Sequence, residues 1–368
     1  VPELRFAGFA DDWELRKLNE VSDIYDGTHQ TPKYQDDGVM FLSVENIKTL
    51  TSNKFISREA FEVEFKIRPQ RGDVLMTRIG DIGTANVVET DEDLAYYVSL
   101  ALFKSEELNP YFLQASIYAP FVQDQIWKRT LHIAFPKKIN KNEIGQVPIN
   151  VPTLAEQTKI GSFFKQLDNT ITLHQRKLDT LKEQKKTYLK LLFPAKGQTK
   201  PALRFQGFED DWEEVKLGEL CDIRTGKLDA NAMVENGKYD FYTSGIKKYK
   251  IDVAEFEGPA ITIAGNGATV GYMHLADGKF NAYQRTYVLT NFKVDRSYIF
   301  SEVAEKLPMK IQQEARTGNI PYIVLSMLTE LSISLPSLPE QEAIGTFFQT
   351  LDQEIAQVED KLASLKEM

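Results

Sequence analysis

Residues 2–27, PELRFAGFADDWELRKLNEVSDIYDG, return at residues 201–226 as PALRFQGFEDDWEEVKLGELCDIRTG, with 16 of 26 positions identical. A second block, PTLAEQTKIGSFFKQLD at residues 152–168, returns at residues 336–352 as PSLPEQEAIGTFFQTLD, with 10 of 17 identical. The first pair lies 199 positions apart and the second 184, so the insert between the blocks is 15 residues shorter in the second copy. The inserts themselves show no visible repeat. A duplicated frame therefore holds two different inserts, as expected of a protein that presents two distinct recognition surfaces.

The composition is that of an ordinary globular protein. The chain has 368 residues, of which 42% are hydrophobic and 26% charged, and this length suggests two or three domains. We expect neither a membrane span nor a secretory signal, because no long apolar run and no basic-then-apolar leader is visible. The single cysteine, Cys221, excludes an internal disulfide and suits a reducing cytoplasm. It aligns with Ser22 in the repeat, so we interpret it as a small core or near-core residue.

Each insert is predicted to form a compact α+β unit. Short runs of β-type residues are separated by Gly, Asp and Asn, which favour turns. The clearest runs are residues 39–42, 74–77, 95–103, 260–264 and 286–289. Helical patterns are fewer and are clearest at residues 111–127 and 298–316.

A long helix is predicted after each insert. Thr153 and Ser337 are natural N-caps, and Glu156 and Glu340 stand three residues later as capping-box partners. Apolar residues then recur at steps of three and four over four or more heptads, which is typical of a coiled-coil seam. The residues that we expect at the coiled coil or a subunit interface are Phe164, Leu167, Ile171, Leu178, Leu181, Phe348, Leu351, Ile355, Leu362 and Leu365.

Charge favours pairing of the two helices. Residues 153–200 contain ten Lys or Arg against four Asp or Glu, whereas residues 337–368 contain two against seven. A pseudo-two-fold relation between the copies would make the helices antiparallel. The alternative is two amphipathic helices that pack separately on their own domains. The predicted domains are globular units at residues 1–152 and 197–336 and long helices at residues 153–196 and 337–368.

The motifs resemble the specificity (S) subunit of type I restriction–modification enzymes over essentially the whole chain. The resemblance lies in LRFxGFxDDWExxKLxE from Leu4 and from Leu203, and in the PxLxEQ and IGxFFxxLD blocks that open each helix. The inserts add DGTHQTPKY at residues 26–34, YTSG at 242–245, IAGNG at 263–267 and FNAYQRT at 280–286. Each motif alone is weak, but their order and duplication are specific.

The resemblance implies two target recognition domains, each reading one half of a bipartite, asymmetric site in double-stranded DNA. The helices are then a ruler that fixes the spacer between the half-sites. Two methyltransferase subunits are expected to dock on the chain, and restriction/translocase subunits to attach through them. In that family the S subunit is not catalytic. S-adenosylmethionine, ATP and Mg belong to the partners, which carry N6-adenine methyltransferase and ATP-dependent endonuclease activities, so we expect no cofactor in this chain.

A search for catalytic motifs finds none in the sequence. Gly226-Lys227 lacks the flanking residues of a phosphate-binding loop, and the glycines at residues 265–271 are spaced GxGxxxG rather than GxGxxG. Four histidines and one cysteine make no zinc pattern, so no metal site is expected. The alternative function, from another class, is a coiled-coil protein–protein adaptor with twin binding domains. The net charge of −9 suits that alternative.

Candidate DNA-binding residues lie in polar loops and have side chains that contact base edges or phosphates. In the first copy they are His29, Gln30, Lys33, Tyr34, Arg78, Arg129, Thr130 and His132. In the second copy they are Lys227, Thr243, Ser244, Lys247, Asn266, Gln284, Arg285, Arg316, Thr317 and Asn319. Arg129-Thr130 and Arg316-Thr317 take equivalent places before the last strand-like segment of each copy, so we expect this loop to meet DNA. The alternative is a solvated charged loop. The repeated Trp13 and Trp212 are expected to be scaffold.

Overall fold

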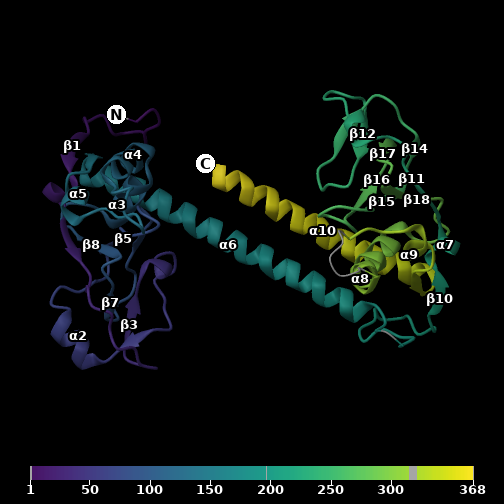
Figure 1. Cartoon of the computed structure of the whole chain (residues 1–368), viewed down its shortest axis with the longest axis horizontal. Helices are drawn as coiled ribbons and strands as arrows, with labels where there is room; N and C mark the ends of the chain where they lie inside the picture. The colour runs from purple at the N-terminus through teal and green to yellow at the C-terminus, as the bar shows by residue number, and fades with distance from the viewer. Residues whose placement is uncertain (1, 196, 315–320, 368) are drawn as a thin grey trace. The chain divides into compact units, whose positions relative to one another are not determined.

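The computed structural model describes residues 2–195, 197–314 and 321–367 and divides into two compact units. Unit 1 comprises Val1–Thr172 and unit 2 comprises Leu173–Met368 (Figure 1). The boundary falls inside one long helix, α6 (Leu154–Leu192), which begins in unit 1 and ends in unit 2. Both units mix strands with helices, which confirms the predicted α+β class.

Unit 1 is built on two sheets that share a core. A four-stranded antiparallel sheet has the order β2-β8-β5-β6, and a three-stranded sheet has the order β4-β3-β7, with β3 and β7 parallel. The strands of unit 1 are β1 (Glu14–Lys17), β2 (Asp23–Asp26), β3 (Val39–Leu42), β4 (Phe55–Ile56), β5 (Val74–Thr77), β6 (Ala85–Val87), β7 (Leu94–Tyr96), β8 (Leu100–Lys104) and β9 (Pro148–Val151). Strand β5 is buried on both faces, because side chains alternate along a strand: Val74 and Met76 face one core, and Leu75 faces the core between the sheets.

The helices of unit 1 are shorter than the sequence pattern suggests. They are α1 (Leu18–Val21), η1 (Val44–Asn46), α2 (Arg58–Glu64), α3 (Pro110–Tyr118), α4 (Pro120–Arg129) and α5 (Lys141–Gly145). The single helix predicted over residues 111–127 is wrong, because Pro120 forces Ala119 into an extended conformation (φ −60°, ψ 138°) and starts a new helix. Similarly, the strand expected over residues 95–103 is interrupted by a turn between β7 and β8, in which Leu100 N donates to Tyr97 O at 2.9 Å.

Unit 2 has the same plan. Its sheets have the orders β11-β18-β15-β16, all antiparallel, and β13-β12-β17-β14, in which β12 and β17 are parallel. Its strands are β10 (Glu213–Lys216), β11 (Asp222–Thr225), β12 (Tyr239–Tyr242), β13 (Tyr249–Ile251), β14 (Phe256–Glu257), β15 (Ala260–Ala264), β16 (Met273–Ala276), β17 (Lys279–Ala282), β18 (Thr286–Thr290) and β19 (Ser332–Leu335). Its helices are α7 (Leu217–Leu220), η2 (Ala230–Ala232), α8 (Arg296–Glu314), α9 (Leu325–Thr329) and α10 (Leu338–Glu367).

The two inserts are therefore repeats of one topology, which their sequences do not reveal. The sheets β2-β8-β5-β6 and β11-β18-β15-β16 have equivalent strand orders. Each second sheet pairs its first strand in parallel with its last, β3 with β7 in unit 1 and β12 with β17 in unit 2. The difference in length falls between β3 and β5 in unit 1, where η1, β4 and α2 stand in place of the β13 and β14 strands of unit 2. The two units thus differ mainly in one segment and in their loops.

The repeated opening and closing blocks form a common frame in each unit. Strand β1 pairs antiparallel with β9, and β10 pairs antiparallel with β19. Trp13 packs edge-on against Phe112 at a ring distance of 6.2 Å, and Trp212 packs in the same way against Tyr298 at 6.2 Å. Both tryptophans lie in the frame rather than in the loops, which agrees with their predicted scaffold role.

A buried ion pair fastens each opening block to its long helix. Arg5 donates two hydrogen bonds to the Glu156 carboxylate, each 2.7 Å, and Arg204 does the same to Glu340. These carboxylates are 1% and 0% exposed. The expected capping boxes are therefore wrong in their second half: Thr153 Oγ1 does accept from Glu156 N, but the glutamate side chains bind arginine instead.

The predicted antiparallel coiled coil is present in unit 2. Its two helices are the second half of α6 and the whole of α10, which run side by side in opposite directions in Figure 1. The buried seam residues are Leu178, Leu181, Ile355, Val358, Leu362 and Leu365. Three ion pairs join the helices across the seam: Lys177–Glu354 (2.8 Å), Lys182–Glu359 (2.7 Å) and Lys185–Asp352 (2.5 Å). Within this unit the alternative of separately packed helices is excluded.

Candidate nucleic-acid interface

The candidate residues of unit 2 gather where four strands end. Lys227 follows β11, Thr243 and Ser244 follow β12, Asn266 follows β15, and Gln284 and Arg285 connect β17 to β18. We call these residues, with Lys247, the unit-2 loop cluster. Sequence placed them in separate loops, and the sheet topology brings them to one edge.

Hydrogen bonds join the loops of the unit-2 loop cluster. The Ser244 hydroxyl donates to Asn266 Oδ1 at 2.6 Å. Gly265 N donates to Arg285 O at 2.9 Å, and Gln284 N donates to Leu228 O at 2.8 Å. The loops are therefore held by their backbones, while Gln284, Arg285 and Lys247 leave their side chains exposed. An ordered backbone with exposed amide, guanidinium and ammonium groups is what base-edge and phosphate recognition requires.

Neighbouring ionisable groups limit the charge of this edge. Lys227 is paired with Glu255 at 2.6 Å. His274 lies between the rings of Tyr242 and Tyr272, and burial lowers its pKa, so the imidazole is neutral near pH 7. Burial also raises the pKa of Tyr242 to about 12. Free positive charge on the unit-2 loop cluster thus comes mainly from Lys247 and Arg285.

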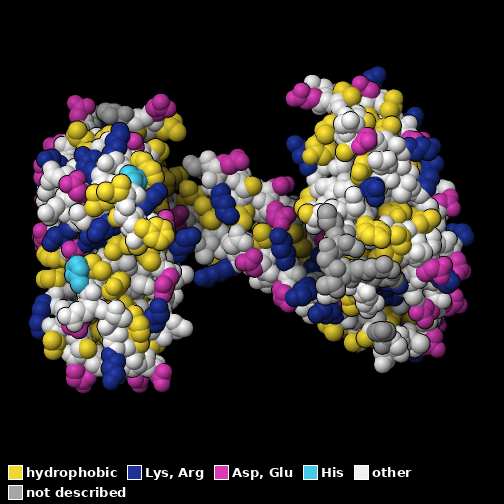
Figure 2. Space-filling view, in the orientation of Figure 1, with side chains coloured by type: hydrophobic (Ala, Val, Ile, Leu, Met, Phe, Trp, Pro, Cys, Tyr) yellow, Lys and Arg dark blue, Asp and Glu magenta, His cyan; other side chains and the backbone are white. Residues whose placement is uncertain are grey.

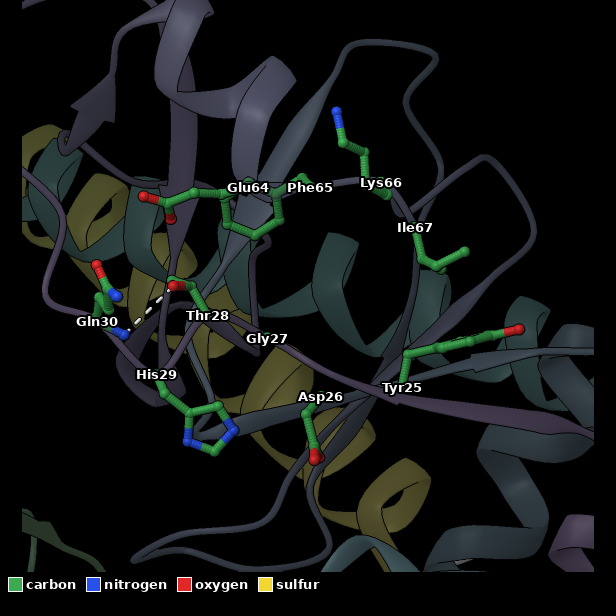
Figure 3. A pocket seen from close by; sticks show the side chains of 10 residues that line it. All are labelled: Tyr25, Asp26, Gly27, Thr28, His29, Gln30, Glu64, Phe65, Lys66 and Ile67. Carbon is green, nitrogen blue, oxygen red and sulfur yellow. Dashed lines mark hydrogen bonds between the residues drawn. The ribbon is translucent and has the colours of Figure 1, made fainter.

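The corresponding edge of unit 1 holds four exposed candidates, His29, Gln30, Lys33 and Tyr34. They follow β2. Thr28 N donates to Tyr96 O at 3.1 Å and Val98 N donates to Thr28 O at 2.9 Å, and these hydrogen bonds hold the loop to the β7–β8 turn. A cavity of about 430 Å³ lies beside them, lined by residues 25–30 and 64–67 (Figure 3). In that view the side chains of Asp26 and His29 extend in the same direction, and Gln30 N donates to Thr28 Oγ1 at 3.3 Å. The end of α2 forms the other wall.

Arg78, a sequence candidate, is buried rather than exposed. Its Nη1 donates to the Asp26 carboxylate and its Nε donates to Ile139 O at 3.1 Å. Its backbone N also donates to Ser99 O at 2.9 Å. With 7% exposure and its guanidinium occupied, Arg78 is placed to position the loops around it rather than to read a base. This geometry was not foreseen, because the sequence does not tell a free arginine from a paired one.

The end of α4 and the loop that follows it contain three more candidates with different surroundings. Arg129 is half-buried and its Nη1 donates to Gln125 O and Oε1 at 3.0 and 2.8 Å. Thr130 is buried and its hydroxyl donates to Ile126 O at 2.9 Å. His132 is exposed and lies against the Trp127 ring with centroids 4.1 Å apart. Arg316, Thr317 and Asn319, the equivalent candidates of unit 2, lie outside the described residues.

Sequence reasoning missed the exposed apolar residues at the end of α4 and in the loop that follows it. Ile133 and Phe135 are fully exposed, and Trp127 is 57% exposed. The available signal was the stretch Ile-Ala-Phe-Pro inside a basic segment that follows a helix, since apolar residues in such a place have no obvious core to join.

The candidate interface residues on the long helices divide into three groups. Leu178, Leu181, Ile355, Leu362 and Leu365 form the coiled-coil seam, and Leu351 is half-buried beside it. Phe348 instead joins the core of unit 2, stacked on Phe193 at 5.9 Å. In unit 1 Leu167 and Ile171 are half-buried, and Phe164 is 39% exposed.

The remaining chemistry of the described residues is structural. Cys221 is buried, and burial raises the pKa of its thiol to about 12, which suits the predicted core role. Burial also raises the pKa of Glu302, which pairs with Lys306 at 2.7 Å. Within residues 2–195, 197–314 and 321–367 no group of three or more His, Cys, Asp or Glu side chains is arranged to hold a metal ion. In the same ranges no helix is long and apolar enough to span a membrane.

Comparison with known proteins points to one family. The family model described as "Type I restriction modification DNA specificity domain" matches residues 10–183 and 209–367. The specificity subunit of the type I restriction enzyme EcoDI of Escherichia coli is 38% identical over 158 residues, covering 43% of this chain and 34% of that protein. The MjaVIII specificity subunit of Methanocaldococcus jannaschii is 24% identical over 397 residues, covering 93% and 86%. The crystal structure of the S subunit of a type I system from M. genitalium shares the fold, with a TM-score of 0.71 at 16% identity over 100% of this chain and 96% of that one.

Proposed function

Because the chain belongs to the family of type I restriction–modification DNA specificity domains, we propose that it is the non-catalytic subunit that selects the DNA sequence for such a complex. The observation that carries the proposal is the repetition of one insert topology with different loops. Two scaffolds of the same plan that present different side chains are suited to read two different half-sites of one bipartite, asymmetric site. The frame residues, which are nearly the same in both copies, cannot distinguish the half-sites.

The unit-2 loop cluster is the stronger candidate for direct base readout. Asn and Gln pair with adenine in the major groove, and Arg pairs with guanine, so Asn266, Gln284 and Arg285 supply the required donors and acceptors. In unit 1, Gln30 and His29 follow β2 on the corresponding edge and lie beside the cavity. Backbone contacts to phosphate would come from the exposed lysines of the same loops, Lys33 and Lys247.

The partners in this proposal are double-stranded DNA and two methyltransferase subunits. The long helices offer the docking surface, because α6 leaves Phe163, Phe164 and Leu173 exposed. Restriction/translocase subunits would join through the methyltransferase subunits. The S-adenosylmethionine, ATP and Mg that methylation and cleavage consume would be bound by those partners. A cytoplasmic location follows from the proposed DNA substrate.

The decisive test is selection of bound sequences from a random pool of duplex DNA, with the chain alone and with its methyltransferase subunits. We expect weak binding by the chain alone, because its net charge of −9 gives little counterion release, and selective retention by the complex. The retained sequences should share two fixed half-sites at a fixed spacing. Binding of the partner subunits without any selected DNA sequence would favour the protein adaptor instead.

A matched pair of variants tests whether the unit-2 loop cluster reads one of the half-sites. Asn266→Ala should relax or change one half-site and leave the other unchanged, with a loss of about 1–3 kcal/mol if its amide pairs with a base. Gln206→Ala is the control, since Gln206 is a polar side chain of unit 2 that is exposed but lies in the repeated frame. Equal site preferences in all three proteins would remove Asn266 from the reading surface.

A further inference from the structure

An apolar tip stands out from unit 1 in the segment Leu131–Lys138, which we call the tip loop. Ile133 is 100% exposed and Phe135 is 103% exposed, so neither side chain has any protein packing. Leu131 is also exposed, at 40%. Burial of such side chains is the main favourable term in folding, and leaving them in water forgoes it. The tip loop is thus better explained by a partner than by folding.

The base of the tip loop is firmly held. Leu131 N donates to Lys138 O at 2.8 Å, which closes the loop on itself. Gly80 N donates to Lys137 O at 2.8 Å, and Ile139 N donates to Arg78 O at 3.0 Å. The tip is therefore mounted on the turn that contains Arg78, whose side chain also binds Asp26 beneath the His29 loop. The tip loop and the unit-1 candidates share one support.

The charge around the tip indicates a polyanionic partner. Lys128, Lys137 and Lys138 are exposed, and the Lys137 ammonium lies 4.8 Å from the centre of the Trp127 ring. The nearby acidic side chains are Asp124, which pairs with Lys128 at 2.5 Å, and Asp81, which accepts from the Thr84 hydroxyl at 2.9 Å. On the face of unit 1 seen in Figure 2, lysine and arginine side chains are interspersed with hydrophobic ones. Lys137 and Lys138 lie close in sequence to the exposed apolar side chains of Ile133 and Phe135. This combination suits nucleic acid, because lysines contact phosphates and apolar side chains contact bases.

We propose that the tip loop is a wedge: Phe135, with Ile133 beside it, inserts between adjacent base pairs of the half-site that unit 1 reads. Proteins that deform DNA use Phe, Leu, Ile or Pro side chains in this way and flank them with cations. The flanking lysines hold the phosphates of the opened step. The half-site then favours an easily unstacked pyrimidine–purine step at this position, so the wedge adds selectivity without a hydrogen bond to a base. This inference rests on the proposed DNA-reading function and specifies how unit 1 performs it.

The test uses the complex of the full chain with its methyltransferase subunits, bound to its selected DNA with 2-aminopurine placed at each half-site position in turn. The fluorescence of this base rises when it is unstacked. We expect a rise at one step that Phe135→Ala abolishes and that Phe135→Leu partly retains. Phe121→Ala is the control, because Phe121 is another exposed phenylalanine of unit 1, at 45% exposure. Affinity should fall about tenfold for Phe135→Ala, within the range for loss of one aromatic–base contact.

The outcomes separate this inference from the function on which it rests. If the wild-type complex selects no DNA sequence, the proposed function fails. If the complex binds selectively and Phe135→Ala leaves the fluorescence pattern and affinity unchanged, the wedge is overturned and the function stands. Phe135→Ala could instead weaken methyltransferase binding while the complex that still forms shows the wild-type fluorescence pattern. That result identifies the tip loop as a protein contact and also overturns the wedge. Ile133→Ala, measured in parallel with thermal unfolding, guards against a folding defect in one variant.

Discussion

The repeated residues of the frame are explained by single contacts. Glu156 and Glu340 each receive two hydrogen bonds from an arginine that lies 151 or 136 positions away in the sequence. The next residue in each copy, Gln157 or Gln341, is also buried. Its side chain accepts from the backbone N of Asn109 or Asp295 (2.9 and 3.1 Å), so it ties the helix entrance to α3 or α8. Sequence alone identified these residues as repeated, but their partners are distant in the chain and only the fold reveals them.

We expect Glu156→Gln to destabilise unit 1, because the largely buried Arg5 guanidinium would lose the carboxylate that balances its charge. Breaking a buried pair costs about 3–5 kcal/mol, and the residual hydrogen bonds of glutamine should keep this loss at the lower end. Arg5 lowers the pKa of Glu156. The stabilisation is therefore complete above the unfolded pKa, near 4.3, and is lost as the pH falls through the lower folded value.

Urea unfolding at several pH values measures this effect. The difference between wild type and Glu156→Gln should be constant at neutral pH and shrink as the pH drops below about 4. The exposed Glu342 provides the control variant, Glu342→Gln, for which we expect almost no change. A difference that persists undiminished in acid would show that the pair contributes through packing and not through charge.

Arg129 remains a predicted DNA contact, now with a defined environment. Its guanidinium is anchored to Gln125, so its orientation is fixed before DNA binds. We expect Arg129→Ala to weaken DNA binding by the methyltransferase complex and, if Arg129 pairs with a base, to cost about 1–3 kcal/mol and relax one half-site.

Comparison with Lys128→Ala decides the nature of the Arg129 contact. Lys128 is exposed on the same helix and is suited to a phosphate, so its loss should weaken binding to all sequences alike and reduce the salt dependence by about one charge. The same two effects in Arg129→Ala would identify a phosphate contact. Wild-type affinity and selectivity in Arg129→Ala, with the fold intact, would exclude this residue from the interface.

At the scale of elements, the sequence predicted most strands correctly but not how they repeat. The runs at residues 39–42, 74–77 and 260–264 are strands with those bounds or within one residue of them. Such runs are recognisable because they are buried on both faces and contain few polar residues. The same property hides the repeat, since many apolar residues fill a two-sided core equally well and topology persists without identity. The loops carry the differences, and nothing in their composition predicts which of their side chains become paired or buried.

Two variants in the coiled coil of α6 and α10 show whether its ion pairs or its apolar seam contribute more to the free energy of unfolding. Leu181 is buried in the seam, whereas the Lys182–Glu359 pair is about half exposed on both sides. We expect Leu181→Ala to cost about 2–4 kcal/mol of unfolding free energy. The upper limit is somewhat below the roughly 5 kcal/mol lost on truncating a leucine at the centre of a core. Lys182→Ala should cost less than about 1 kcal/mol, because water and salt screen exposed pairs.

Unfolding in low and high salt separates the two contributions. The loss from Leu181→Ala should be independent of salt, and the small loss from Lys182→Ala should vanish at high salt. Equal losses in the two variants would mean that the interhelical ion pair contributes as much to stability as the apolar seam. Charge would then serve stability as well as the choice of partner and orientation.

For the whole molecule, the main question is what sets the distance between half-sites. Helix α6 is continuous from unit 1 into unit 2, so it is the natural ruler of the proposed function. The stretch 178–186 of α6 is a poor place to lengthen this ruler, because it carries seam leucines and two of the three interhelical ion pairs. An insertion there would shift the pairing with α10. The point between Thr172 and Leu173 avoids those contacts, because Leu173 is 63% exposed and the ion pairs begin at Lys177.

We therefore expect four residues inserted between Thr172 and Leu173 to lengthen the spacer and leave both half-sites unchanged. Four residues add about 6 Å of helix and slightly more than one full turn, so the flanking faces are nearly preserved. Since DNA rises about 3.4 Å per base pair, the spacer should grow by one or two base pairs. Two inserted residues are the control, because they turn the following face to the opposite side and should abolish activity. Methylation mapping in cells that carry each variant with its methyltransferase reads out the result. An active four-residue variant with the original spacer would show that α6 does not set the distance, since the reading loops are the same in both proteins.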